Sequence, residues 1–279
     1  MDRERLKKLA GNPKFIPGVY NYCDRWCERC PFTSRCMNFA LGEEQFSDPE
    51  ARDIDNELFW QKLAETFQTN LDMLKKTAEE QGIDLDSFEI ETAMEEERLN
   101  EETAKNHECS RAAKVYGEMV DIWFDSAKGL FEKKADKLRL KAELEVPNVN
   151  PVGEAANLKD AVEIIRWYQH QIYVKLMRTI RGELIEKSEI LDEFPKDSDG
   201  SAKIALIATE RSIAAWREMR DQFPEQGDDI LDLLVHLDRL RRRIEKSFPA
   251  ARAFVRPGFD EIVQHSEPMH TVDVRNSCH

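Results

Sequence analysis

Apolar residues recur at spacings of three and four along most of the chain, which is the period of amphipathic α-helices. The stripe of the first long segment consists of Phe59, Leu63, Phe67, Leu71 and Leu74. Five segments of this kind are predicted as long helices, over residues 47–80, 100–142, 158–190, 201–222 and 228–248. A short basic helix is predicted before them, over residues 2–10. No stretch shows the alternation with period two that marks a β-strand, so we expect an all-α fold, a bundle of about five helices.

The ends of these helices are predicted from capping residues, proline and glycine. Ser47 or Asp48 is the expected N-cap of the first long helix, because Pro49 and acidic residues follow in its first turn. Gly82 is expected to end that helix, and the acidic residues 83–102 are expected to form a connection to the next one. Ser201 is the expected N-cap of the fourth long helix.

The pattern divides the chain into a basic N-terminal segment (residues 1–46), a helical bundle (47–248) and an irregular tail (249–279). The net charge of the 279 residues is −14, but it is distributed unevenly. Residues 1–42 hold eight Lys or Arg and four Asp or Glu, whereas residues 43–102 hold five Lys or Arg and twenty Asp or Glu. The basic segment is therefore expected to dock on the acidic helical region.

Nucleic-acid binding is the alternative role for the basic segment, through Lys7, Lys8, Arg25, Arg29 and Arg35. The acidic region next to it would repel a polyanion, so a protein partner is the more favoured possibility. No apolar run is long enough to cross a bilayer, and the charged N-terminus is not followed by the apolar stretch of a secretory signal. We therefore expect a cytoplasmic location and no membrane contact.

Four of the six cysteines lie within 14 residues, spaced C-x3-C-x2-C-x5-C. They are Cys23, Cys27, Cys30 and Cys36. In a reducing compartment such a group is more typical of metal binding than of disulfides. Four thiolates suit either a [4Fe-4S] cluster or a zinc ion, and the compact spacing, with Pro31 after Cys30, favours the cluster. Tyr20, Tyr22, Trp26 and Phe32 lie around them and are expected to shield the site.

The stretch CERCPFTSRC, residues 27–36, reads C-x2-C-P-aromatic-x3-C. It resembles the cysteine segment of [4Fe-4S] sites in RecB-type nucleases and in SPASM-type radical enzymes. The resemblance covers ten residues and implies that Cys27, Cys30 and Cys36 ligate a cluster, with Cys23 as the fourth ligand. In those nucleases the fourth cysteine lies far upstream, beside a core of strands with paired carboxylates and a lysine. The present sequence predicts no such core, so nuclease activity is not implied.

Cys23, Cys27 and Cys30 also match the C-x3-C-x2-C pattern of radical S-adenosylmethionine enzymes. Those enzymes usually carry an aromatic residue before the third cysteine, where this chain has Arg29. They are built on a βα barrel, which a helical chain does not form. We therefore expect a structural, redox-sensing or partner-binding role for the cysteine site.

A second metal site inside the bundle is the basis of an enzymatic alternative, a redox or oxygenase-like activity. No histidine has the glutamate three positions earlier that carboxylate-bridged iron sites require. A looser set is formed by Glu163, His170, Glu210 and His236. The competing interpretation is that Glu163 pairs with Arg166 and that His236 is an ordinary boundary residue. Further potential ligands are scattered in the tail, at His265, Glu267, His270, Asp273, Cys278 and His279.

Overall fold

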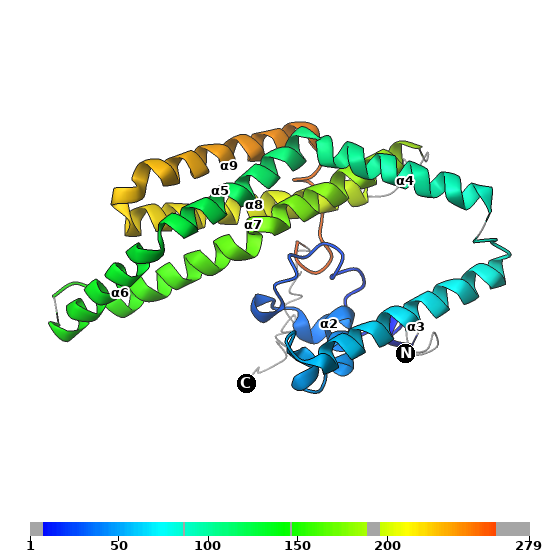
Figure 1. Cartoon of the computed structure of the whole chain (residues 1–279), viewed down its shortest axis with the longest axis horizontal. Coiled ribbons are helices and arrows are strands. Elements are labelled where there is room, and N and C mark those ends of the chain that lie inside the picture. Colours follow the sequence, from blue (N-terminus) through cyan, green and yellow to red (C-terminus); the bar gives the residue numbers. More distant parts are fainter. Residues whose placement is uncertain (1–7, 86, 146, 189–195, 261–279) are drawn as a thin grey trace, which may run out of the picture.

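The computed structural model describes residues 8–85, 87–145, 147–188 and 196–260 of the chain. Every regular element in these residues is helical, which confirms the predicted all-α class (Figure 1). The α-helices are α2 (Met37–Gln45), α3 (Glu57–Gln81), α4 (Phe88–Asn106), α5 (Glu108–Ser126), α6 (Lys128–Glu143), α7 (Pro151–Ser188), α8 (Asp197–Gln222) and α9 (Gly227–Ser247). Short 3₁₀ turns are η1 (Cys27–Arg29), η2 (Thr33–Arg35), η3 (Glu50–Arg52) and η4 (Pro224–Gln226). None of the described helices combines the length and apolar character that a membrane span requires.

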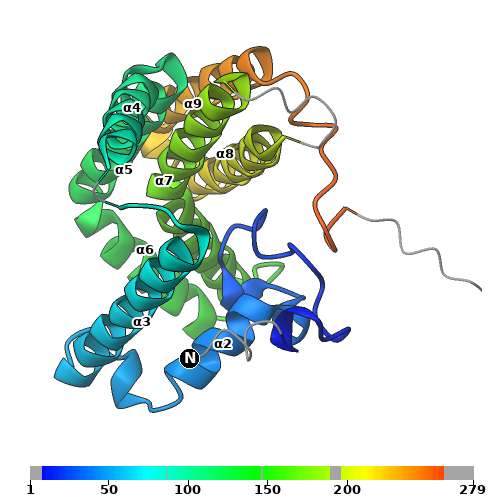
Figure 2. The ribbon, with the colours of Figure 1, turned by 90° about the vertical axis from the view of Figure 1, so that its right-hand side faces the viewer.

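The core is enclosed by four helices. Helix α5 packs against α7, α7 against α8, α8 against α9, and α9 back against α5. Figure 2 shows these four side by side, with α2 and α3 lying apart from them. Tyr116 and Trp216 are fully buried between them, and the Trp216 indole donates a hydrogen bond to the Tyr116 hydroxyl at 3.1 Å. The expected number of about five bundle helices is not confirmed, because the helix predicted over residues 47–80 lies outside this core.

Small residues explain how closely α8 approaches its neighbours. Its buried face consists largely of glycine, serine, alanine and threonine: Ser198, Gly200, Ser201, Ala202, Ala205, Ala208, Thr209, Ser212 and Ala215. Side chains of this size allow two helix backbones to come together along their length. The contact between α7 and α8 is accordingly the most extensive in the described fold.

The helix predicted over residues 100–142 is divided in the structure among α4, α5 and α6. The first break is at His107, which has extended backbone angles, ends α4 and begins α5. Its Nδ1 accepts a hydrogen bond from the Cys109 backbone N–H at 3.2 Å. The second break is at Ala127, between α5 and α6. Neither break contains proline, so the hydrophobic period alone did not reveal them.

Residues 83–102 are mostly helix α4, not a connection. The helix begins at Phe88, with Ser87 as N-cap. Arg98 forms ion pairs with Glu95 and Glu102 at spacings of three and four residues. Such pairs stabilise an exposed helix, which is why so acidic a segment is helical.

Three predicted helix ends can be compared with the structure. Gly82 ends α3 with a φ of 69°, as expected. The start of that helix was predicted wrongly, because its N-cap is Asn56 and η3 occupies the earlier position. Ser201 is not an N-cap either, since α8 begins at Asp197 and Ser201 is buried within it.

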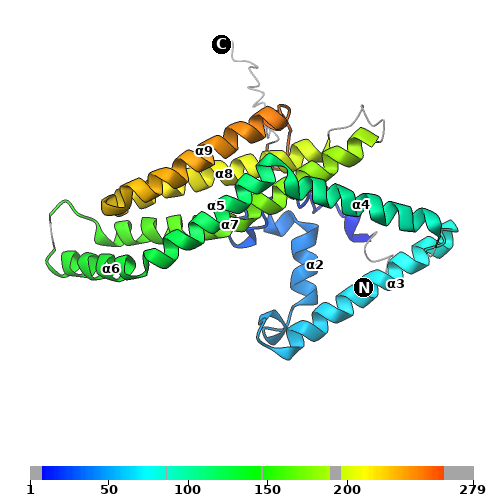
Figure 3. The ribbon, with the colours of Figure 1, turned by 45° about the horizontal axis from the view of Figure 1, so that its top comes forward.

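The apolar stripe of α3 is not buried in the core. Phe67, Leu71 and Leu74 have exposed fractions of 61%, 50% and 60%. Figure 3 shows α3 along an edge of the molecule, joined to the bundle through α4. The periodicity predicted the helix correctly, but not what covers its apolar face.

Ile172 and Val174 provide a matched test of this core. Ile172 on α7 is fully buried, whereas Val174 on the same helix is 58% exposed. We expect Ile172→Ala to lower the free energy of unfolding by about 3 kcal/mol, because it leaves a cavity. Val174→Ala is expected to change it by less than about 0.5 kcal/mol. Urea denaturation of both variants checks this, and equal losses would contradict the assignment of the core.

Candidate metal centre

The cysteine segment, defined here as residues 20–36, is a loop with two tight turns. In η1 the Cys30 N–H donates to the Cys27 carbonyl, and in η2 the Cys36 N–H donates to the Thr33 carbonyl, both at 3.2 Å. Two sulfurs accept backbone hydrogen bonds at 3.4 Å, Cys30 Sγ from the Phe32 N–H and Cys36 Sγ from the Phe39 N–H. These turns bring the cysteines to one side of the loop.

All four cysteines line one small cavity, with a volume of about 20 Å³. Most of its remaining wall is apolar or aromatic: Val19, Tyr20, Trp26, Phe32, Phe39 and Phe259. Three of the four aromatic residues expected to shield the site therefore do line it. The fourth, Tyr22, packs elsewhere, with its ring 4.6 Å from that of Phe254.

Burial is the main influence on the pKa of two of these thiols, Cys27 and Cys30. It raises the pKa of Cys27, and the other three cysteines raise it further. Burial also raises the pKa of Cys30, partly opposed by the hydrogen bond from Phe32. The four sulfurs therefore lie within electrostatic reach of one another, in surroundings that disfavour an uncompensated thiolate. As they stand, no three His, Cys, Asp or Glu side chains of the described residues form a group that could hold a metal ion.

Asp24 joins the cysteine segment to the bundle. Its carboxylate accepts hydrogen bonds from the Tyr168 hydroxyl at 2.6 Å and from Arg211 at 2.7 Å. Its backbone carbonyl accepts from the Trp167 indole at 3.0 Å and from Gln171. Burial, followed by the hydrogen bond to Asp24, raises the pKa of Tyr168 well above its ordinary range. One residue is thus held by side chains from both α7 and α8.

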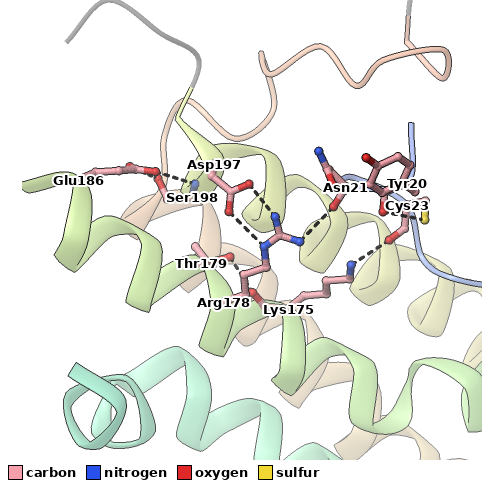
Figure 4. Close-up of polar contacts among 9 residues, drawn as sticks. All are labelled: Tyr20, Asn21, Cys23, Lys175, Arg178, Thr179, Glu186, Asp197 and Ser198. Atoms are coloured by element: carbon pink, nitrogen blue, oxygen red, sulfur yellow. Dashed lines mark hydrogen bonds and ion pairs between the residues drawn. The ribbon is translucent and has the colours of Figure 1, made fainter. Parts of the chain in front are cut away.

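Two cationic side chains of α7 hold backbone carbonyls of the same segment (Figure 4). Lys175 donates to the Cys23 carbonyl at 2.9 Å, and Arg178 donates to the Asn21 carbonyl at 3.2 Å. Arg178 also forms an ion pair with Asp197 at 2.7 Å. Lys175 is 7% exposed, and burial lowers its pKa. A buried ammonium group therefore contacts the backbone of Cys23.

At Trp26 and Arg29 the cysteine segment contacts α7 mainly through aromatic stacking and ion pairs. Trp26 stacks on Trp167 with ring centroids 5.0 Å apart, and the Arg29 guanidinium lies over the Trp26 ring at 4.0 Å. Arg29 continues to α7, where it pairs with Asp160 at 2.5 Å and with Glu163 at 2.6 Å. The segment was expected to dock on the acidic region 43–102, but these contacts place it on α7 and α8.

The chain after α9 also reaches the site, which the sequence pattern did not predict. The Phe259 ring packs edge-on against Phe32 at 4.8 Å and lines the cavity. Next to it, Asp260 pairs with Arg256 at 2.8 Å and with Lys203 of α8 at 2.7 Å. Arg256 and Lys203 hold the pKa of the Asp260 carboxyl well below its usual range. No sequence motif connects residue 259 with the cysteines.

The four residues of the hypothesised second site have other partners. Glu163 binds Arg29 and Lys159, whereas its predicted partner Arg166 pairs with Asp121. The remaining three are likewise placed by unrelated contacts: Glu210 pairs with Arg252, His236 Nε2 contacts the Ala112 carbonyl at 2.7 Å, and His170 lies against Gly117. The part of the chain that the structure describes therefore offers no support for a second metal site.

The basic residues proposed for nucleic-acid binding are mostly exposed, and Arg29 is held by its two carboxylates on α7. Lys7 lies outside the described residues, as do the six potential ligands of the tail from His265 to His279. Comparison of the chain with protein-family models, curated proteins and solved structures finds no match. The interpretation of the site therefore depends on its own geometry.

Gly200 and Gly42 provide a matched test of the docking. A methyl group at Gly200 in α8 would lie 2.7 Å from a ring carbon of Phe254 and nearer still to the Tyr22 ring. One at Gly42 in α2 would meet nothing within 4 Å. We expect Gly200→Ala to lower the free energy of unfolding by about 1 to 3 kcal/mol through overpacking, and Gly42→Ala to raise it by about 0.5 to 1 kcal/mol. Urea denaturation distinguishes them; a stabilising Gly200→Ala would contradict the Tyr22 packing.

Asp260 predicts a loss of stability in acid. Because its pKa is lower in the folded chain, it stabilises the fold above its unfolded pKa of about 3.9. That contribution is lost as the pH falls through the folded value. Asp260→Asn is therefore expected to be less stable than the parent chain at pH 7, by about 1 kcal/mol. The difference should shrink below about pH 4 when denaturation midpoints are measured across pH; a difference that stays constant would contradict it.

Proposed function

We propose that the cysteine segment binds a [4Fe-4S] cluster through Cys23, Cys27, Cys30 and Cys36, as a structural and redox-sensing centre. The observation that carries the proposal is that one short loop places all four cysteines around one cavity whose remaining wall is mostly apolar. Four soft donors that converge in this way are an uncommon arrangement without a metal. The same loop is fixed to α7 and α8, so a group bound there would report on, and contribute to, the docking of the N-terminal segment.

The surroundings of the sulfurs favour a metal over four free thiols. Burial opposes charge on Cys27 and Cys30, and a bound cation offsets that cost. Backbone N–H groups already donate to Cys30 and Cys36. Hydrogen bonds of this kind stabilise negative charge on sulfur, which is the state that ligates a metal.

The spacing of the cysteines along the chain favours a cluster over zinc. All four lie within 14 residues, and Pro31 follows Cys30. Structural zinc sites more often draw their four ligands from two pairs that are well separated in the chain. Zinc remains the alternative outcome of the experiment below.

A bound [4Fe-4S] cluster supplies one-electron chemistry whose potential depends on nearby charge, hydrogen bonds to sulfur and solvent exposure. This chain supplies each of these influences. Lys175 holds a buried positive charge behind Cys23 and favours the more negative, reduced form. Trp26, Phe32 and Phe259 form part of the cavity wall and reduce the exposure of the sulfurs to solvent.

Because Lys175 and the residues that bind Asp24 hold the backbone beside Cys23, a change at the cysteines would be transmitted directly to the docked surface. This contact supports a sensing or structural role in preference to catalysis. The centre would stabilise the packing of residues 20–36 on α7 and α8, and loss of the cofactor would weaken it.

Metal analysis of protein purified without oxygen tests the proposal. We expect a brown protein with broad absorption at about 400 nm and about four iron and four sulfide per chain. Cys30→Ser should lose most of the iron, because it removes a ligand. Cys109→Ser is the matched control, since Cys109 is a buried cysteine on α5 outside the cavity.

Each outcome has a definite meaning. A colourless protein with one zinc per chain that is lost in Cys30→Ser would replace the cluster by a zinc site. No bound metal in the parent chain, or equal metal content in the two variants, would overturn the proposal of a metal centre at these cysteines.

A further inference from the structure

Four large apolar residues of helix α3, called here its exposed stripe, face solvent. Trp60, Phe67, Leu71 and Leu74 are each at least half exposed, over four turns of a 25-residue helix. Scattered exposed apolar residues are common on protein surfaces, but a contiguous row of large ones marks an interaction site. The stripe follows a single face, because its members are three, four and seven residues apart.

The contacts of α3 within the chain leave this stripe uncovered. Its main packing contact in the described fold is with the turn η3. Phe59 packs against Phe46 at 5.9 Å, and Thr66 accepts a hydrogen bond from Gln45 of α2. These contacts involve Phe59 and Thr66 and leave the exposed stripe uncovered. Figure 3 shows the helix at the edge of the molecule, away from α7, α8 and α9.

Two charged residues beside the stripe indicate what covers it. Glu57 and Lys75 are 18 residues apart, which is five turns of an α-helix, so they lie on the same side at a separation of about 27 Å. Both are exposed. Glu57 accepts a hydrogen bond from Gln61 of its own helix, and Lys75 has no ion-pair partner among the described residues. One flank of the stripe is thus negative near one end and positive near the other.

These charges match those of a second α3 helix that runs in the opposite direction. If a second α3 lies antiparallel, Glu57 of each helix faces Lys75 of the other, at both ends of the contact. In a parallel twofold arrangement the flanks that carry Glu57 and Lys75 would lie on opposite sides of the contact, so these pairs would not form. The midpoint between the charged residues is residue 66, next to Phe67 in the middle of the stripe, so the antiparallel pairing also aligns the apolar side chains.

We propose that α3 is a dimerisation helix, which packs antiparallel against α3 of a second copy of this chain around a twofold axis near Phe67. Two identical surfaces that pair in this way form a closed dimer. The apolar stripe supplies the affinity, and the two Glu57–Lys75 pairs set the orientation, because exposed ion pairs contribute specificity more than strength. The proposal does not depend on the cofactor of the cysteine site.

Sedimentation of the full-length chain tests the contact. We expect a dimer for the parent protein at concentrations of about 1 to 100 µM. Phe67→Lys combined with Leu71→Lys should raise the dissociation constant by roughly a hundredfold or more. Leu144→Lys is the matched control, because Leu144 is 66% exposed at the end of α6, and it should leave the dimer unchanged. Circular dichroism verifies that each variant keeps its helices.

Charge reversal tests the orientation. Glu57→Lys or Lys75→Glu alone creates like-charge contacts and should weaken the dimer about tenfold. The double variant Glu57→Lys/Lys75→Glu restores opposite charges at both ends and should bring the dissociation constant back to near the parent value.

The possible results either support or overturn the proposal. A monomeric parent protein over the whole concentration range overturns it and leaves the stripe to a different partner. A dimer that survives Phe67→Lys/Leu71→Lys overturns the role of α3. A double variant as weak as the single variants overturns the antiparallel arrangement.

Discussion

The position of the cysteine segment depends on how the bundle holds Asp24. Tyr168 and Arg211 bind its carboxylate while Trp167 and Gln171 bind its carbonyl. A carboxylate at this partly buried position would be costly without such donors. These donors fix Asp24 on the bundle, and the neighbouring residues are held nearby. Lys175 donates to the Cys23 carbonyl, and Trp26 stacks on Trp167. The geometry of the cavity is therefore a consequence of packing on α7 and α8.

The same bundle serves two different tasks. Its interior, made from α5, α7, α8 and α9, supplies stability through buried side chains such as Ile172 and Trp216. Its outer surface on α7 and α8 supplies the polar and cationic groups that hold the loop. Gly200 shows how closely the two are connected, because the absence of a side chain there admits the rings of Tyr22 and Phe254. Helix α3 neither contributes to this core nor holds the cysteine segment. Its exposed stripe is therefore the surface for which we propose a second copy of the chain as partner.

Much of the helical content could be predicted from the sequence, because amphipathic periodicity is a local property. Gly82 at the end of α3 was predicted for the same reason, since a left-handed residue at a helix end favours glycine. The breaks at His107 and Ala127 were not predicted, because neither residue has a distinctive preference. The acidic α4 was missed because its many charged residues leave no clear apolar stripe, although its ion pairs and its packing on α7 support a helix.

The helical class could be predicted from the sequence, as could the grouping of four cysteines in one loop and the aromatic residues around them, because these depend on spacing along the chain. The docking site of that loop, the place of Phe259 in its cavity and the pairing of Glu163 with Arg29 instead of Arg166 are visible only in the folded chain. The same holds for the position of the α3 stripe outside the core. These features depend on contacts between residues far apart in the chain, and a hydrophobic period indicates that a face is covered without indicating by what.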